Sequence, residues 1–214
     1  MLHKDKRIVS PEMLSLTIHL QLLPELNEFY LVGGTALALQ LGHRNSIDID
    51  LFTQNDFSSE NLRTFLKSHF NDVRIDHEGK KTCLTVINKI KVDFITHPYP
   101  FIKPPITEEG ITYLSKEDIA AMKLNAIINS GQRLKDFIDV YFLLEHFSVR
   151  DMVGFFEKKY PNTNPLVALK ALSYFGDIDE SIDPPKLFKH IPIKKIKARI
   201  YKAVTNADKI FSVP

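Results

Sequence analysis

The sequence predicts an α/β front over residues 1–105, followed by an all-helical rear over residues 106–214. Short runs in which apolar and polar residues alternate precede the proline-rich link 98–105, and such runs are typical of half-buried strands. After the link, apolar residues recur at a period of about 3.6, which is typical of helices. At 214 residues the chain is long enough for one large core or two small domains.

The front begins with a helix, for which Ser10 is a typical N-cap and Pro11 a typical first residue. A glycine pair, Gly33-Gly34, then separates a short buried strand from a second helix. The residues Asn88-Lys89 form a weak turn signal between two alternating runs, which together indicate a hairpin. In chain order we expect helices at 11–23, 35–40 and 58–70 and strands at 29–32, 47–52, 73–77, 82–87 and 90–95.

The rear begins at a sequence that resembles a capping box, in which Ser115 precedes Asp118 in place of the usual glutamate. The helix that it opens should end at Asn129, before Ser130-Gly131. Further helices are expected at 133–146, 150–160, 165–175 and 191–205.

The composition is that of an ordinary soluble globular protein, with 44% apolar and 25% charged residues. A net charge of +2 does not require a polyanionic partner. The single cysteine, Cys83, excludes an internal disulfide framework, and no Cys/His cluster suggests zinc. Because neither a signal peptide nor a membrane-spanning run is visible, we expect a cytoplasmic protein without membrane contact.

Two aspartates one residue apart, Asp48 and Asp50, are the most informative residues of the chain. In a strand they share one face, whereas Ile47, Ile49 and Leu51 are expected to enter the core. Two carboxylates roughly 6–7 Å apart repel each other by about 2–3 kcal/mol, which a bound Mg²⁺ or Mn²⁺ would relieve. Alternation alone favours the simpler interpretation, that these aspartates form the polar face of a half-exposed strand.

The neighbouring Gly33-Gly34-Thr35 shifts the balance toward a nucleotide site. A helix N-terminus attracts anions, and glycines let a phosphate approach the backbone closely. Asp93 is a candidate third carboxylate, which would hold a metal or accept a proton. The alternative is an exposed strand residue that pairs with Lys91.

Charged residues of the rear supply further candidates. Lys123 lies among apolar residues of its expected helix, so it either extends to the surface or contacts phosphate. Asp136 and Asp139 share a helix face, and they are capping or solvated charges or partners of Lys123 or of the substrate. Arg133 and Lys135 stand beside them within reach of phosphate.

The tail is basic and carries a buried helical stripe of isoleucines, so its charges should form the outer face of a helix. Such a face is usually only solvated, and RNA contact is the less favoured interpretation. The eight histidines show no ligand spacing. The basic residues are Lys186, Lys189, Lys194, Lys195, Lys197, Arg199 and Lys202.

Taken in order, these motifs resemble the AbiEii/AbiGii-type toxins, a family of the DNA polymerase β-like nucleotidyltransferase superfamily. The resemblance covers about residues 30 to 145. It is carried by Gly33-Gly34-Thr35-Ala36-Leu37-Ala38-Leu39, His43-Arg44-Asn45-Ser46-Ile47-Asp48-Ile49-Asp50-Leu51-Phe52, Lys91-Val92-Asp93-Phe94-Ile95, Lys123-Leu124-Asn125-Ala126 and Arg133-Leu134-Lys135-Asp136-Phe137-Ile138-Asp139-Val140.

The resemblance implies a nucleotidyltransferase fold, in which a mixed β-sheet is flanked by helices and followed by a helical C-terminal part. It implies Mg²⁺ (or Mn²⁺) held by Asp48, Asp50 and Asp93, and transfer of a nucleoside monophosphate from an NTP. The triphosphate would be bound by Gly33, Gly34, Thr35, Arg44, Ser46 and Lys123, while Lys123 and Asp136 carry over as functional residues. Lys135 stands where arginine is commoner and lacks its bidentate fork.

Members of the family act as toxins of type IV-like toxin–antitoxin or phage-abortive systems, and some modify tRNA. The resemblance therefore implies an RNA acceptor and a separately encoded antitoxin. Two alternatives stay open: a non-catalytic module that binds nucleotide or a partner, and an enzyme that modifies a small molecule such as an antibiotic.

Overall fold

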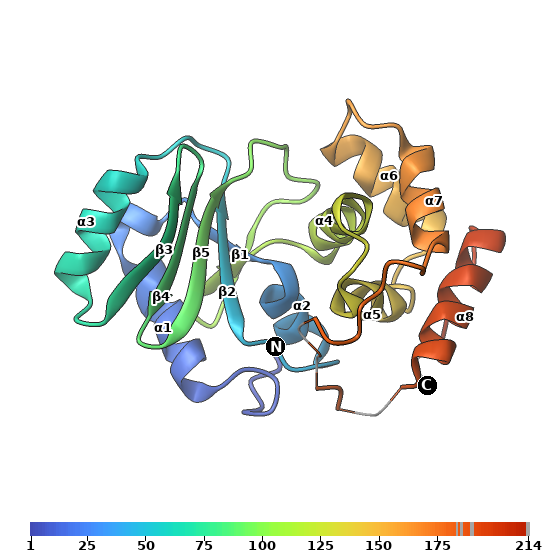
Figure 1. Ribbon diagram of the computed structural model, residues 1–214, viewed down its shortest axis with the longest axis horizontal. Coiled ribbons are helices and arrows are strands. Elements are labelled where there is room, and N and C mark those ends of the chain that lie inside the picture. Colours follow the sequence, from blue (N-terminus) through green and yellow to red (C-terminus); the bar gives the residue numbers. More distant parts are fainter. Residues whose placement is uncertain (183, 185, 189–190, 213–214) are drawn as a thin grey trace.

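The computed structural model describes residues 1–182, 184, 186–188 and 191–212 (Figure 1). Among these residues, one mixed sheet has seven strands in the order β3-β4-β5-β2-β1-β7-β6. The strands are β1 (Tyr30–Val32), β2 (Asp48–Thr53), β3 (Val73–Gly79), β4 (Thr82–Ile87), β5 (Ile90–Thr96), β6 (Ile106–Glu108) and β7 (Ile111–Tyr113).

Helices flank this sheet and form the C-terminal half of the molecule (Figure 1). In the front they are α1 (Pro11–Leu22), a 3₁₀ turn at Pro24–Leu26, α2 (Gly33–Leu41) and α3 (Ser59–His69). In the rear they are α4 (Lys116–Asn129), α5 (Leu134–Leu143), α6 (Val149–Lys159), α7 (Pro165–Ser173) and α8 (Ile193–Thr205). The predicted fold class, a mixed sheet flanked by helices and followed by a helical part, is confirmed.

Local capping explains where several of these helices begin. The side chains of Ser10, Ser58 and Ser115 each accept a hydrogen bond from the backbone amide three residues later. Ser148 and Asp151 form a full capping box at the start of α6.

Two expectations from the sequence are wrong. The rear is not all helical, because β6 and β7 lie beyond the proline-rich link and extend the sheet through pairing of Leu31 with Tyr113. Ile47 does not enter the core but is 65% exposed, because β2 begins only at Asp48. The division into domains at residue 105 stays a prediction.

The register of β2 and β5 sets the position of the acidic residues. The two strands are parallel neighbours, with Asp48 opposite Lys91 and Asp50 opposite Asp93. The β4–β5 hairpin turns at Asn88 and Lys89, whose φ angles of 50° and 67° are those that a tight hairpin turn needs. Because opposed residues of neighbouring strands point to the same face, the three aspartates share one side of the sheet.

The front and the rear share one apolar core. Buried side chains from the sheet, α2, α4, α5, α6 and α8 form a single cluster, and α2 contacts both α4 and α5. A buried ion pair joins α4 to α6, with 2.8 Å between Lys159 Nζ and Asp118 Oδ1. Asp118 also accepts from the amides of Ile102 and Lys103, so the proline-rich link is bound to the helical part. These contacts hold the sheet and the helices on either side of one cleft.

Candidate active site

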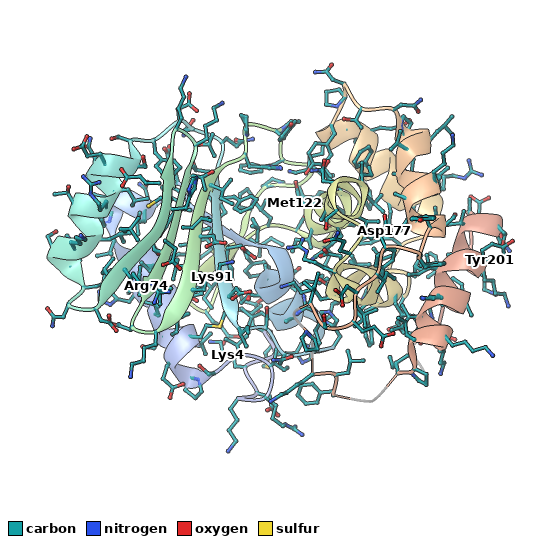
Figure 2. All side chains as sticks on the ribbon, in the orientation of Figure 1. Lys4, Arg74, Lys91, Met122, Asp177 and Tyr201 are labelled. Carbon is teal, nitrogen blue, oxygen red and sulfur yellow. The ribbon has the colours of Figure 1, made fainter. Side chains whose placement is uncertain are left out.

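The cleft lies between the acidic face of the sheet and α4, α5 and the end of α6, and it has a volume of about 330 Å³. Figure 2 labels Lys91 on β5 and Met122 on α4, which lie on its two sides. Nine of the predicted site residues line it: Gly33, Gly34, Arg44, Ser46, Asp48, Asp50, Asp93, Lys123 and Asp136. Thr35 is not among the lining residues.

The acidic wall holds three carboxylates at unequal depths. Asp93 is buried, at 7% exposure, whereas Asp48 and Asp50 are partly exposed. Although the residue is partly exposed, loss of water around its carboxylate, together with the charge of Asp93, raises the pKa of Asp50 to about 6. Burial also raises the pKa of Asp93, although Lys91 opposes this shift because its Nζ lies 3.0 Å from Asp93 Oδ2. Ionised carboxylates at this wall therefore need a compensating positive charge.

The donor chemistry of this wall fits a hard divalent cation. Asp93 Oδ1 is buried and has no hydrogen-bond partner among the described residues. Carboxylate oxygens are the ligands that Mg²⁺ and Mn²⁺ prefer. The described residues do not form a closed set of three such ligands around one point. Two lysines lie beside these carboxylates, Lys91 at Asp93 and Lys135 with its Nζ 3.8 Å from Asp48 Oδ2.

The glycine pair opens α2 directly beside the carboxylates. Gly33 has a φ of 67°, and a Cβ at this position would collide with the carboxylate of Asp50. A Cβ on Gly34 would collide with the guanidinium of Arg44. Position 33 therefore requires glycine, whereas a side chain at Gly34 would have to displace Arg44. The two glycines leave the N-terminal amides of α2 at the edge of the cleft.

Thr35 lies below the floor of the cleft. Its side chain is 1% exposed. Its hydroxyl donates to the backbone carbonyl of Asp48, and its Oγ1 lies 2.8 Å from Ser46 Oγ. Thr35 thus fixes the start of β2 and the loop before it, and triphosphate contact by this residue stays a prediction.

The opposite wall contains a buried ionic network centred on Asp139, which is fully buried. Its carboxylate accepts two bonds from Arg44, at 2.6 and 2.9 Å, and one from Lys123 at 2.6 Å. His43 Nε2 lies 2.8 Å from the same group. Burial alone would raise the pKa of Asp139, but Arg44 and Lys123 hold it well below its usual range.

Lys123 connects this network to the cleft. Its Nζ lies 2.8 Å from Asp136 Oδ1 as well as 2.6 Å from Asp139, so both aspartates partner Lys123. Asp136 also pairs with Arg133 at 2.9 Å. The network contains three cationic and two anionic side chains, Arg44, Lys123, Arg133, Asp136 and Asp139, and therefore carries a net charge of +1 toward the acidic wall.

An aromatic group that sequence reasoning missed closes one end of the cleft. The ring centroids of Phe52 and His97 are 5.5 Å apart, and His97 Nε2 lies 3.1 Å from the hydroxyl of Tyr160. Burial, with the charge of Lys159, lowers the pKa of His97 to about 4, so the imidazole is neutral near pH 7. The sequence carries a signal for Phe52, because it lies two residues after Asp50 and therefore on the same strand face as Asp48 and Asp50.

The basic residues of the C-terminal tail do not all form an exposed outer face of α8. Ile196 and Ile200 are buried in α8, as the stripe predicted. Arg199 is not free, because it donates to Glu145 at 2.6 Å and its guanidinium stacks 3.7 Å from the ring centroid of Tyr141. Lys189 lies outside the described residues.

The model of the family described as nucleotidyl transferase AbiEii toxin, type IV TA system, matches residues 16–204. An uncharacterized protein of Aquifex aeolicus (strain VF5) is 33% identical over 187 residues, which cover 85% of this chain and 86% of that protein.

Solved structures share the fold. A Helicobacter pylori protein described as a candidate nucleotidyltransferase superposes with a TM-score of 0.62 at 19% identity, covering 95% of this chain and 96% of that one. The structure of MenT4, a nucleotidyltransferase toxin of Mycobacterium tuberculosis H37Rv, superposes with a TM-score of 0.58 at 16% identity, covering 91% and 83%. No helix among the described residues has both the length and the apolar character to span a bilayer.

Proposed function

The chain belongs to the AbiEii family of nucleotidyltransferase toxins, and we propose that it transfers a nucleoside monophosphate from an NTP to RNA, with tRNA the first candidate. The reaction would depend on Mg²⁺ or Mn²⁺ and would release pyrophosphate. The proposed setting is the cytoplasm, in a type IV-like toxin–antitoxin or phage-abortive system whose antitoxin is encoded separately.

One observation carries this proposal: an acidic wall faces a cationic wall across one cleft. Asp50 and Asp93 are opposed in register on β2 and β5, with Asp48 on the same face. Across the cleft stand Lys123, Arg133 and Lys135. Metal-bound triphosphates need both carboxylates for the metal and cations for the phosphates.

The residues of the acidic wall would hold the metal and manage a proton. Asp48, Asp50 and Asp93 would hold Mg²⁺, which would supply activation of the attacking hydroxyl and charge compensation for the leaving pyrophosphate. The acceptor oxygen bonds to the α-phosphorus as the bond from that phosphorus to pyrophosphate breaks. Asp93 would take the hydroxyl proton as that bond forms.

The remaining residues would position the substrate. The amides at Gly33 and Gly34 open α2 and suit phosphate oxygens. Arg133 is 41% exposed at its side chain and has reach toward phosphate, whereas the charge of Lys123 is largely balanced by Asp136 and Asp139. Lys123 would therefore act mainly by holding Asp136 and Asp139 in the cationic wall.

A panel of acceptors tests the proposal. The protein is incubated with each α-labelled NTP and Mg²⁺ or EDTA, in the presence of tRNA, other bacterial RNA or aminoglycosides. Label in tRNA only when Mg²⁺ is present supports the proposal. Label on an aminoglycoside would identify an antibiotic-modifying enzyme, and NTP binding without any labelled product would identify a non-catalytic module.

A further inference from the structure

A second hollow, of about 520 Å³, lies at the start of β2, outside the cleft. We call it the basic groove and define it by Lys6, Arg7, Ser46, Ile47, Lys186 and Phe188, which are among its lining residues. The chain beyond α7 returns here to the loop between α2 and β2, where the amide of Asn45 donates to the carbonyl of Lys186 at 2.9 Å (Figure 1).

The basic groove adjoins the cleft through shared lining residues. A smaller hollow of about 110 Å³ lies between them. It shares Asn45, Ser46 and Ile47 with the basic groove. It shares Arg44, Ser46, Asp48 and Lys135 with the cleft. An extended molecule that lies in the basic groove would therefore be led along residues 45–47 to the carboxylate of Asp48.

The charge of the basic groove favours a polyanion. Lys6, Arg7 and Lys186 are exposed, and no carboxylate is among the described residues that line this hollow. Arg7 pairs with Asp5, which lies outside the lining, at 2.6 Å. Their side chains are 69% and 38% exposed, so this pair contributes little stability and can exchange for a phosphate.

The basic groove also presents apolar surface beside its cations. Ile47 is 65% exposed and Phe188 is 42% exposed, although both are large apolar side chains. The guanidinium of Arg7 lies 4.5 Å from the ring centroid of Phe188. Cations that follow a backbone, next to apolar and aromatic faces on which bases stack, are the features of single-stranded nucleic acid sites.

We propose that the basic groove binds the single-stranded end of an RNA acceptor and directs its terminal hydroxyl toward Asp48. This inference rests on the proposed function, because it assigns the acceptor of that reaction to a particular surface. It places the RNA contact near the N-terminus and the loop before β2 rather than on the basic face of α8.

RNA binding without turnover tests the basic groove. A 5′-fluorescein-labelled single-stranded RNA of 12 nucleotides is titrated with wild type, with the Lys6→Ala/Arg7→Ala variant and with the Lys67→Ala/Lys80→Ala variant as matched control. Lys67 and Lys80 are exposed on α3 and at the β3–β4 turn, away from the hollow. Anisotropy is measured over a salt series, and NTP binding verifies that each variant is folded.

The Lys6→Ala/Arg7→Ala variant should lose two phosphate contacts. Each lost contact lowers the slope of log affinity against log salt by about 0.7 for single strands, so the slope should fall by about 1.4. If the two proteins bind equally at 1 M salt, this difference corresponds to about 25-fold weaker binding at 0.1 M salt. The control variant should match wild type within about twofold.

Equal weakening in both double variants, or no RNA binding by wild type at low salt, would overturn the assignment. In the second case a protein or a small molecule would be the occupant of the basic groove. Because anisotropy needs no catalysis, the two proposals fail separately. RNA binding that depends on Lys6 and Arg7, without any nucleotidyl transfer, refutes the proposed function alone. If the protein transfers nucleotide to RNA but binds that RNA equally well without Lys6 and Arg7, only the proposed role of the basic groove is refuted.

Discussion

Replacing Asp139 with asparagine should strongly destabilise the protein, because this carboxylate compensates two buried cations. Arg44 and Lys123 both donate to it, and their side chains are 3% and 8% exposed. The substitution preserves shape and hydrogen-bonding oxygen but raises the net charge of the network from +1 to +2. Removing one partner of a buried ion pair typically costs about 3–5 kcal/mol.

Because asparagine still accepts a hydrogen bond and Lys123 keeps Asp136, we expect a loss near the lower limit, about 3 kcal/mol in free energy of unfolding. The pair of Arg150 with Asp208 supplies a matched control, since it has the same bidentate geometry at about 70% exposure. Asp208→Asn should cost less than about 1 kcal/mol.

Urea unfolding followed by circular dichroism measures both changes. A loss for Asp139→Asn that is no larger than the loss for Asp208→Asn would refute the reasoning. It would mean that Arg44 and Lys123 find other compensation, and that the cationic wall does not depend on Asp139.

Three further predictions concern particular positions. Gly34→Ala should force Arg44 away from its partners, lower the free energy of unfolding in urea by about 1–3 kcal/mol and weaken NTP binding measured by calorimetry. Unchanged NTP binding would contradict the close contact between Gly34 and the guanidinium of Arg44. The pKa of His97 is about 4 in the folded protein and ordinarily 6.5, so the unfolded chain binds more protons between these values and stability falls as pH falls through that window. Between about pH 7.5 and pH 5 the folded protein should lose about 1–2 kcal/mol of its free energy of unfolding through His97. In urea unfolding at both pH values, His97→Asn should lack this pH-dependent loss. Ile47→Ala should change the melting temperature little, whereas Ile49→Ala, at a fully buried position, should cost about 2–5 kcal/mol; equal losses would show that Ile47 is packed after all.

The sequence predicted those site residues whose positions follow from the local alternation of apolar and polar residues or from glycines. Alternation in β2 and β5 placed Asp48, Asp50 and Asp93 on strand faces, and the glycines marked the start of α2. The three carboxylates line one cleft because β5 pairs directly with β2.

Contacts between distant segments were not predictable in the same way. Arg44 and Asp139 are 95 positions apart, and only packing of α2 against α5 brings them together. The sequence does not single out His97, because a histidine that packs in an aromatic cluster shows no ligand spacing. The β6–β7 hairpin was missed because its strands have three residues each, too few to show a period.

The central claim is that the acidic wall performs nucleotidyl transfer, and transfer kinetics test it most directly. Each α-labelled NTP is incubated with Mg²⁺ and total bacterial RNA, using wild type, Asp48→Asn, Asp50→Asn and, as control, Asp56→Asn at an exposed aspartate. We predict label in an RNA band with wild type and the control, and a loss of at least about 100-fold in both site variants while they stay folded. Full transfer by folded Asp48→Asn and Asp50→Asn would contradict the account.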